Sequence, residues 1–496
     1  ISGYPVVAAT EDGAYITVRC SEEINADGTL NFDSCDPGQI QCDEYRNAKK
    51  GEECMPWFTW HGFRYFELTN NAKPVRCEVV HSDCAVTSAF ESDSEMLNWL
   101  YDAYIRTQLS NMHSGVPSDC PHIERLGYTG DGQLCCEAAM MLLDSQKFYQ
   151  KWLEDISDCQ STDNGHVQHT APFMGGGGGP AGWGGAIAVV PYEMYKIYGD
   201  RETFRRYLPK ILRYFDYLDS RSSGGLVCRE EQGGWCLGDW CTPEPIAICE
   251  PFVNTALCVK QMLMTKEAAE AIGEKETAQM LGRRIEEKRQ AILNAYYSPQ
   301  TGSFIGDVQG ANSFATDIGL GGERAYENTR KKYSAADSFD TGIFGTDILT
   351  RVLFERGDAN TAFRLLTSEG KGSFYNMKKQ GATTIWENWD GERSHSHPMF
   401  GAATRYLFSF ILGITQEKTS AGYEHILIAP QIPDGLNYAS GHITTVRGKI
   451  SVTFKRTESE ADFYVTVPQR ARFTYGSGCE FELRDGENHI HIDFEE

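Results

Sequence analysis

Within residues 92–105, SDSEMLNWLYDAYI, the spacing of apolar residues changes from the alternation typical of strands to the spacing typical of a helix. Ser94 or Asp93 can cap a helix here, because a side-chain oxygen at such a position accepts a hydrogen bond from an unpaired backbone N–H of the first turn. The apolar residues that then recur at helical spacing are Met96, Trp99, Leu100 and Ala103. Since residues so spaced share one face, the stretch predicts an amphipathic helix and the start of a helical domain.

The residues before this stretch alternate between apolar and polar side chains. Segments 15–20, 63–68 and 75–80 show this alternation and are bounded by turn residues. Such a pattern is typical of half-buried strands. We therefore predict an N-terminal antiparallel β-sandwich over residues 1–92.

Helix-like segments continue after the first one, joined by loops rich in Gly, Pro and Trp. They cover residues 133–143, 147–156, 187–198, 201–218, 252–272, 274–295, 346–356, 359–366 and 402–412. No short sequence repeat is present, which argues against a solenoid. A toroid of paired helices, with its loops gathered at one end, fits the number and length of these segments. We predict it over residues 93–415.

Strand-like alternation returns after residue 416. It covers residues 425–429, 442–446, 449–455, 461–467 and 489–494, with Gly, Pro, Asn and Asp in the turns. This predicts a second antiparallel β-sandwich over residues 416–496. The expected fold is a multi-domain α+β chain in which a helical domain is flanked by two β-sandwiches.

The composition excludes several classes of protein. With 41% hydrophobic and 23% charged residues, the 496-residue chain is an ordinary globular protein. Its 46 basic and 69 acidic residues give a net charge of −23, which repels nucleic acid and anionic membranes. No apolar run is long enough to span a bilayer. We expect no nucleic-acid or membrane partner.

The cysteines and the start of the chain suggest a compartment. Many of the 16 cysteines lie in apolar runs and none forms a zinc-type spacing, so we expect buried thiols in a reducing environment. The chain starts at Ile1 without Met, a basic region or an apolar leader, so no signal peptide is visible. We expect a bacterial protein of the cytoplasm or periplasm, and a chain that is part of a longer protein.

The densest acidic cluster lies in residues 119–131, DCPHIERLGYTGD. Its carboxylates belong to Asp119, Glu124 and Asp131, and they are interleaved with Cys120, Leu126 and Tyr128. A solvated connection is one interpretation, but such a loop does not need apolar neighbours. Partly buried carboxylates have shifted pKa values, which a general acid requires. The segment therefore predicts a catalytic loop.

Two other loops each place one acid between two tryptophans. They are residues 381–390, GATTIWENWD, with Glu387 and Trp386, and residues 233–240, GGWCLGDW, with Asp239 and Trp240. Tryptophan faces stack on sugar rings, and an apolar wall raises a carboxylate pKa. The alternative for Glu387 is an acid at the edge of a Trp-rich core, pointing to solvent. Acidic loops set among tryptophans fit glycoside hydrolysis by a carboxylate pair best. We expect Asp239 to contact the sugar substrate.

A glycine run and two histidine pairs remain. Residues 171–183, APFMGGGGGPAGW, lack the Gly-Lys-Ser/Thr of a phosphate-binding loop, so the run is either a flexible connection or a close approach of backbone to a ligand. His166 with His169 and His395 with His397 resemble metal pairs. Neither pair shows a third ligand, so we predict no metal. We expect His397 to contact a ligand hydroxyl.

Three motifs together resemble the α-L-rhamnosidases of glycoside hydrolase family 78. They are residues 56–65, PWFTWHGFRY, the acidic segment 119–131 and residues 381–389. The resemblance implies an (α/α)6 barrel flanked by β-sandwiches and an inverting mechanism. Members of the family usually carry further β domains before the one that starts here, which supports the expectation that Ile1 lies inside a longer chain.

By this resemblance Glu124 matches the general acid and Glu387 the general base. The residues that it assigns to sugar binding are Asp119, Asp131, Tyr128, Trp183, Trp240, Trp386 and His397. The chain differs from many members at His122-Ile123, at Gly184-Gly185 after Trp183, at its glycine run and at residues 394–399. These differences are typical of a divergent branch.

Three functions follow as hypotheses. The first is release of terminal α-L-rhamnose by hydrolysis, without a cofactor. The second is β-elimination of rhamnose from glucuronate, as in the similar barrel of polysaccharide lyase family 27, where a calcium ion could take part. The third is a carbohydrate-binding protein without catalysis. The pair Glu124 and Glu387 favours hydrolysis, with a carbohydrate as the partner. The oligomeric state stays open.

Overall fold

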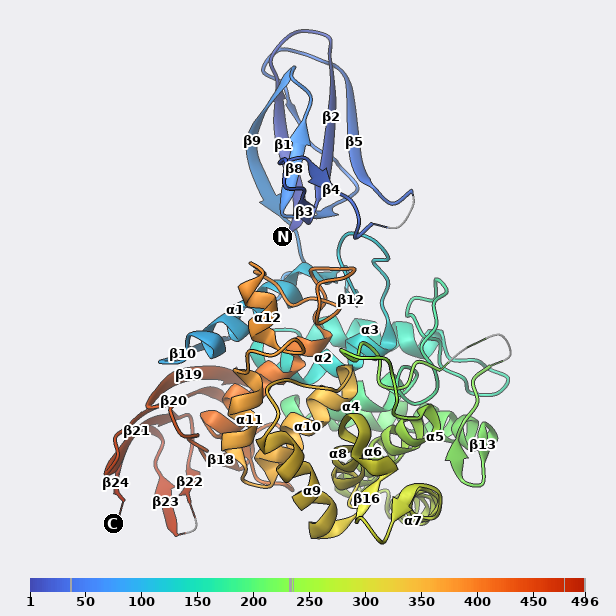
Figure 1. Ribbon diagram of the computed structural model, residues 1–496, viewed down its shortest axis with the longest axis vertical. Helices are drawn as coiled ribbons and strands as arrows, with labels where there is room; N and C mark the ends of the chain where they lie inside the picture. The colour runs from blue at the N-terminus through green and yellow to red at the C-terminus, as the bar shows by residue number, and fades with distance from the viewer. Residues whose placement is uncertain (36–37, 232–233, 235, 477, 495–496) are drawn as a thin grey trace.

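The computed structural model describes residues 1–496 except 36–37, 232–233, 235, 477 and 495–496. Strands form a separate layer at the N-terminal end, helices fill the middle, and further strands lie beside them at the C-terminal end (Figure 1). The chain is therefore a mixed α and β protein, as the alternating and helical periods predict. Its sheets in the described residues are antiparallel except for one pair, Ile426–Ile428 with Ala471–Tyr475, which is parallel and departs from the expected antiparallel C-terminal sandwich. Among the described residues, every helix is too short or too polar to span a bilayer.

The N-terminal strands form two antiparallel sheets around one small core. One sheet joins β1 (Ser2–Ala9) with β6 (Glu53–Cys54), β7 (His61–Gly62) and β9 (Ala72–Val79), and the other has the order β5 (Gln41–Ala48), β2 (Ala14–Ser21), β8 (Tyr65–Leu68). A short pair, β3 (Glu23–Ile24) and β4 (Leu30–Asn31), lies beside them. Val7, Ile16, Val18 and Phe63 pack between the strands.

Twelve α-helices lie in the described residues. They are α1 (Glu95–Ser110), α2 (Thr129–Leu142), α3 (Gln146–Asp158), α4 (Ala186–Tyr198), α5 (Arg201–Ser220), α6 (Glu250–Ala271), α7 (Lys275–Tyr296), α8 (Ala311–Asp317), α9 (Gly322–Ser334), α10 (Ile343–Glu355), α11 (Ala359–Leu366) and α12 (Phe374–Lys379). Ser94 caps α1, since its side chain accepts the backbone N–H of Leu97, as predicted. Short hairpins follow α1 (β11, Met112–His113, with β12, Val116–Pro117), α5 (β13, Ser222–Ser223, with β14, Leu226–Val227) and α7 (β15, Tyr297–Ser298, with β16, Ser303–Phe304).

The helices form a closed ring with a second layer around it. Going round the ring, α2 packs on α4, α4 on α6, α6 on α8, α8 on α10, and α10 on the short helix η2 (Met399–Thr404), which returns to α2. Helices α3, α5, α7, α9 and α11 pack outside it. Ring helix α2 is buried along almost its whole length, whereas outer helix α5 buries one face, because a ring helix has neighbours on all sides.

Some helical segments differ from the prediction. Residues 402–412 were expected to be one α-helix, but they form the 3₁₀ turn η2 and the π-helix η3 (Leu407–Ile411). Helices α8 and α9 were not predicted. Helix α8 is a single short element after the irregular turn η1 (Ile305–Gly310), and α9 is mostly polar, so neither shows a long apolar period.

The C-terminal strands form two sheets that face each other. One has the order β10 (Ser88–Ser92), β19 (Tyr438–Thr445), β20 (Gly448–Arg456), β21 (Glu460–Val467), β24 (Gly486–Asp493), and the other β17 (Ile414–Gln416), β18 (Ile426–Ile428), β22 (Ala471–Tyr475), β23 (Cys479–Leu483). Phe463 of the first sheet and Phe473 of the second pack with ring centroids 5.0 Å apart.

The first of these strands corrects the predicted boundary at residue 92. Strand β10 was assigned to the N-terminal sandwich, but it pairs antiparallel with β19, Phe90 opposite Gly441. Consecutive strands often pair, but the packing of the folded chain can also place a strand beside one that is distant in sequence. The expected thiols are buried where the sequence placed them, in α2 at Cys135 and Cys136 and in α6 at Cys258.

Candidate active site

The acidic segment forms a tight loop between β12 and α2. The backbone N–H of Leu126 donates to Asp119 Oδ1 (2.8 Å), and the thiol of Cys120 lies 3.0 Å from Asp119 Oδ2. Asp131 is in the first turn of α2, where the helix dipole favours a negative charge. The segment therefore aims two carboxylates from fixed backbone positions.

A second loop, residues 380–398, carries Glu387 between α12 and η2. The N–H of Ser394 donates to Glu387 Oε2 (3.2 Å), and the N–H of Glu387 donates to the carbonyl of Ser394 (2.9 Å). The ring of Trp386 stacks on His395 with centroids 4.2 Å apart. These contacts close the loop on itself and hold the Glu387 carboxylate in place.

His397 joins the two loops. Its Nε2 lies 3.0 Å from Asp131 Oδ1, and its Nδ1 lies 3.8 Å from Glu387 Oε2. Burial by itself would lower the pKa of His397, but the hydrogen bond to Asp131 and the charges of Glu387 and Asp119 raise it to about 9. At neutral pH the imidazole is therefore a buried cation among carboxylates.

Asp119 and Glu124 form the other half of the site. Burial raises the pKa of Asp119 well above its usual value, and the charge of Glu124 adds to the effect while His397 opposes it. Glu124 is more open, with a third of its side chain exposed, and its Oε1 lies 3.6 Å from Nη2 of Arg393, which belongs to the Glu387 loop. The two candidate catalytic acids thus lie on facing loops joined by Arg393 and His397.

The N-terminal strands support this loop through residues that the prediction left without a role. Arg125, the neighbour of Glu124, has a positive φ of 56° and lies over the ring of Trp60 at 3.9 Å. Trp60 in turn stacks on His113 of β11 at 4.1 Å. A positive φ costs free energy in residues other than glycine, and the packing of the Arg125 guanidinium on Trp60 stabilises it here. The motif at residues 56–65 was the signal that could have identified this support.

The glycine run packs on aromatic side chains of the site. A Cβ on Gly176 would lie 2.8 Å from the ring of Tyr128, and a Cβ on Gly178 would lie 2.3 Å from the ring of Trp183. Glycine is therefore needed in this run because the backbone passes close to the rings of Tyr128 and Trp183, where a side chain would clash.

The predicted sugar-binding tryptophans differ in accessibility. Trp183 and Trp386 are only 3% and 4% exposed, so most of each ring is covered by the protein, and their contact with a sugar stays a prediction. Trp240 is 38% exposed and keeps a face for stacking on a ligand. Tyr128 is half-buried, and burial raises the pKa of its hydroxyl. Residues 233 and 235 of the Asp239 loop lie outside the described residues.

Asp239 holds a helix instead of facing a ligand. Its carboxylate is fully buried and accepts backbone N–H groups from Gly342 (2.7 Å), Phe344 (3.0 Å) and Gly345 (2.9 Å) at the start of α10. The expectation of sugar binding by Asp239 is thereby corrected. The residue satisfies free N–H groups of a buried helix start, which an acid does well.

Replacing Asp239 with alanine is expected to destabilise the protein by at least about 2 kcal/mol, because three buried N–H groups lose their acceptor. Asp239→Asn keeps one acceptor oxygen and should lose less. The urea midpoint of unfolding measures both effects. An Asp239→Ala variant with an unchanged midpoint and a raised KM for a rhamnoside would restore the sugar-binding role.

The buried cation also predicts a pH dependence of stability. A histidine whose pKa is raised from 6.5 to about 9 contributes stability that is complete below pH 6.5 and is lost as pH rises through about 9. The melting temperature of His397→Gln should therefore lie furthest below that of the wild type near about pH 6 and approach it near about pH 9.5. Differential scanning fluorimetry across this range tests it, and a difference independent of pH would contradict it.

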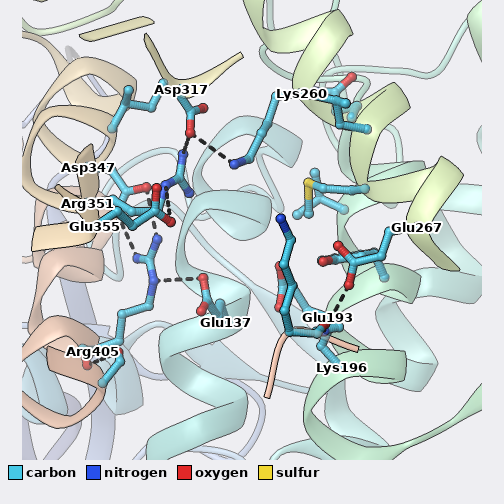
Figure 2. Close-up of a pocket in the computed structure, with 18 of the residues that line it drawn as sticks. Glu137, Glu193, Lys196, Lys260, Glu267, Asp317, Asp347, Arg351, Glu355 and Arg405 are labelled. Atoms are coloured by element: carbon cyan, nitrogen blue, oxygen red, sulfur yellow. Dashed lines mark hydrogen bonds and ion pairs between the residues drawn. The ribbon is translucent and has the colours of Figure 1, made fainter. Parts of the chain in front are cut away.

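A cavity of about 870 Å³ lies elsewhere in the ring, among the later turns of α2, α4, α6 and α10. Figure 2 shows its charged lining, and none of the predicted site residues is among the described residues that line it. Buried Arg405 pairs with Asp347 (2.8 Å) and Glu137 (2.7 Å), and Asp317 pairs with Lys260 (3.0 Å) and Arg351 (2.7 Å). These ion pairs tie ring helices together across the cavity. In the sequence, these ion pairs could have been suspected from charged residues that lie within otherwise apolar helices.

Comparison with known proteins agrees with the fold. The model of the bacterial α-L-rhamnosidase 6 hairpin glycosidase domain matches residues 85–411, that of the C-terminal domain of these enzymes matches residues 413–474, and that of their concanavalin-like domain matches residues 1–86. An α-L-rhamnosidase of Streptomyces avermitilis is 29% identical over 97% of this chain and 50% of its own length. One of Alteromonas sp. (strain LOR) is 28% identical over 92% of this chain and 52% of its own. The chain thus spans about half the length of these relatives.

Solved structures show the same likeness. The crystal structure of the Streptomyces avermitilis α-L-rhamnosidase complexed with L-rhamnose superposes with a TM-score of 0.89 at 26% identity, over 99% of this chain and 51% of that one. The α-L-rhamnosidase from Dictyoglumus thermophilum has the same fold, with a TM-score of 0.90 at 22% identity over 99% of this chain and 61% of that one. The matched glycosidase domain covers well over half of the chain and confirms the resemblance seen in the three motifs. The chain belongs to the bacterial α-L-rhamnosidase family of glycoside hydrolases.

Proposed function

We propose that this chain hydrolyses terminal α-L-rhamnosides with inversion, with Glu124 as general acid and Glu387 as general base. The observation that carries the proposal is the junction of the two loops, in which Arg393 approaches Glu124 and His397 contacts both Asp131 and Glu387. In this proposal the closed helical ring is an (α/α)6 barrel and the flanking sheets are β-sandwiches. The relative solved with L-rhamnose supports the choice of sugar.

The reaction needs one acid and one base on opposite sides of the anomeric carbon. Glu124 would give its proton to the departing glycosidic oxygen, while Glu387 takes a proton from water as the water oxygen attacks the anomeric carbon. The C–O bond to the aglycone breaks, a new C–O bond forms on the opposite face, and the two carboxyl groups exchange protonation states. Inverting enzymes place these groups about 6.5–9.5 Å apart so that the water fits.

The surrounding charges suit these roles. Burial, with the charge of Glu124, raises the pKa of Asp119, so Asp119 favours holding a proton beside the loop of the proposed acid. His397 is a buried cation that attracts the carboxylates of Glu387 and Asp131. It therefore lies on the side of the site where Glu387 would receive a proton from water. Asp119, Asp131 and His397 would also bind sugar hydroxyls, and Trp240 and Tyr128 would contact the ring.

The proposal is tested with p-nitrophenyl α-L-rhamnoside and with a rhamnose-capped arabinogalactan. The expected products are free L-rhamnose, first seen by NMR as the inverted anomer, and an acceptor glycan. Hydrolysis products together weigh about 18 Da more than elimination products, so mass spectrometry separates the two reactions. An unsaturated uronate would establish a lyase, and binding without turnover would establish a carbohydrate-binding protein.

A further inference from the structure

Two histidines that are neighbours in sequence meet a distant acid beside the candidate active site. His166 and His169 lie in the loop between α3 and α4, and Glu230 follows β14, more than 60 residues later. All three side chains are buried, Glu230 to 2% exposure. Their ligand atoms lie within 4.8 Å of one another. The third ligand that the sequence did not reveal is therefore supplied by the fold.

The separations within this cluster suit a metal ion. His166 Nε2 lies 3.4 Å from Glu230 Oε1, and His169 Nε2 lies 3.0 Å from Glu230 Oε2. Ligand atoms of a tetrahedral zinc ion, bonded at about 2.0–2.2 Å, are separated by about 3.3 Å. Two imidazole nitrogens and a carboxylate oxygen form a donor set that zinc accepts, with a fourth position left for water.

The buried nitrogen of His166 is the observation that points to a ligand. His166 Nε2 has no contact with solvent and makes no well-aligned hydrogen bond, since its approach to Glu230 Oε1 is long, at 3.4 Å. His169 bonds Glu230 at 3.0 Å, whereas His166 is left with the longer approach to the same carboxylate. Burying a poorly hydrogen-bonded imidazole nitrogen costs free energy, and a metal ion at the cluster would bond it directly.

Further contacts hold the three ligands in place. The hydroxyl of Tyr217 on α5 donates to Glu230 Oε1 (2.7 Å), and the N–H of Glu231 donates to the same oxygen (2.8 Å). The carbonyl of His169 accepts the N–H of Thr129 (2.8 Å) at the start of α2. Metal sites typically have such outer hydrogen bonds, and here they lead directly to the loop that carries Tyr128.

We propose that His166, His169 and Glu230 bind a zinc ion that ties the loop after α3 to the segment after β14. The ion would brace the backbone behind Tyr128 and the glycine run, and it would have no part in the transfer of protons to the sugar. The proposal does not depend on the reaction that the site catalyses.

The test strips metal from the full chain by chelation, adds zinc back and removes the excess by dialysis. Wild type is then expected to hold about one zinc per chain by mass spectrometry of the metal, and His166→Ala and His169→Ala to hold none. Tyr217→Phe keeps the three ligands but removes an outer bond, so its affinity should fall about tenfold or more. Cobalt(II), added in place of zinc, should give the intense visible bands of a four-coordinate site in wild type and, at about tenfold higher concentration, in Tyr217→Phe, but not in the two histidine variants.

A second cluster supplies the matched control. Glu460, His491 and Asp493 lie close together on the exposed edge of the C-terminal sheet. His491→Ala should keep the tight zinc, whereas a loss in this variant with retention in His166→Ala would overturn the proposal. If circular dichroism shows that a histidine variant is unfolded, the cobalt titration of Tyr217→Phe decides instead, and an affinity equal to that of wild type would overturn the proposal. Wild type without bound zinc or cobalt bands would show that the cluster is a hydrogen-bonded network alone.

Discussion

Replacing Glu124 with glutamine is expected to lower kcat on an unactivated rhamnoside by about a thousandfold or more, because a carboxamide cannot protonate the leaving oxygen. The substitution keeps the shape of a side chain that is only one-third exposed and that lies 3.6 Å from Arg393. KM should therefore change much less than kcat. Initial rates on a natural rhamnoside and on p-nitrophenyl α-L-rhamnoside measure the effect.

The two substrates separate the acid from other roles. A p-nitrophenolate leaves without much help from a proton, so Glu124→Gln should lose far less activity on it than on a natural rhamnoside. Equal losses on both would show that Glu124 positions the sugar. A variant that keeps more than about a tenth of wild-type activity on the natural substrate would remove Glu124 from catalysis.

Replacing Glu387 with glutamine is expected to lower kcat by several orders of magnitude on both substrates. Water must be deprotonated whatever the leaving group, so an activated aglycone gives no relief. Glu387 is held by the N–H of Ser394 and lies beside His397, and glutamine can keep the first contact while losing its charge. The binding of rhamnose, measured by calorimetry, should survive.

The matched control lies five residues away. Glu392 is exposed in the same loop, so Glu392→Gln removes one negative charge without touching the site. Its kcat should stay within about twofold of wild type, since exposed charges contribute little. If Glu392→Gln and Glu387→Gln lose activity equally, the effect belongs to the loop and its folding. If Glu387→Gln stays active, the base is another residue.

Much of the secondary structure could be predicted because it depends on local patterns of apolar and polar residues. Helices such as α5 and α7 and strands such as β20 and β21 were expected within a few residues of their observed ends, since their apolar periods depend on neighbours three, four or two residues away. The cap at Ser94 was predicted for the same reason. Helix α9 was missed because its apolar face consists of a few residues in a polar segment.

The candidate site was predicted by residue type but not by exposure. Trp183 and Trp386 have the composition of a sugar platform, yet Gly130, Gly178 and His395 pack over them. Asp239 has the same sequence context as Glu387, an acid between tryptophans, yet it accepts three N–H groups of α10. Burial depends on which elements pack above a residue, and a local motif does not contain that information.

The sequence by itself therefore determined the order of strand and helix regions, the family and the two loops that carry Glu124 and Glu387. Only the tertiary structure decided that His397 bridges Asp131 and Glu387, that β10 joins β19, and that Glu230 meets His166 and His169. The physical reason is the range of the interactions. Periodicity and capping act over a few residues, whereas pairing between distant charges, strands and metal ligands is selected by packing of the whole chain.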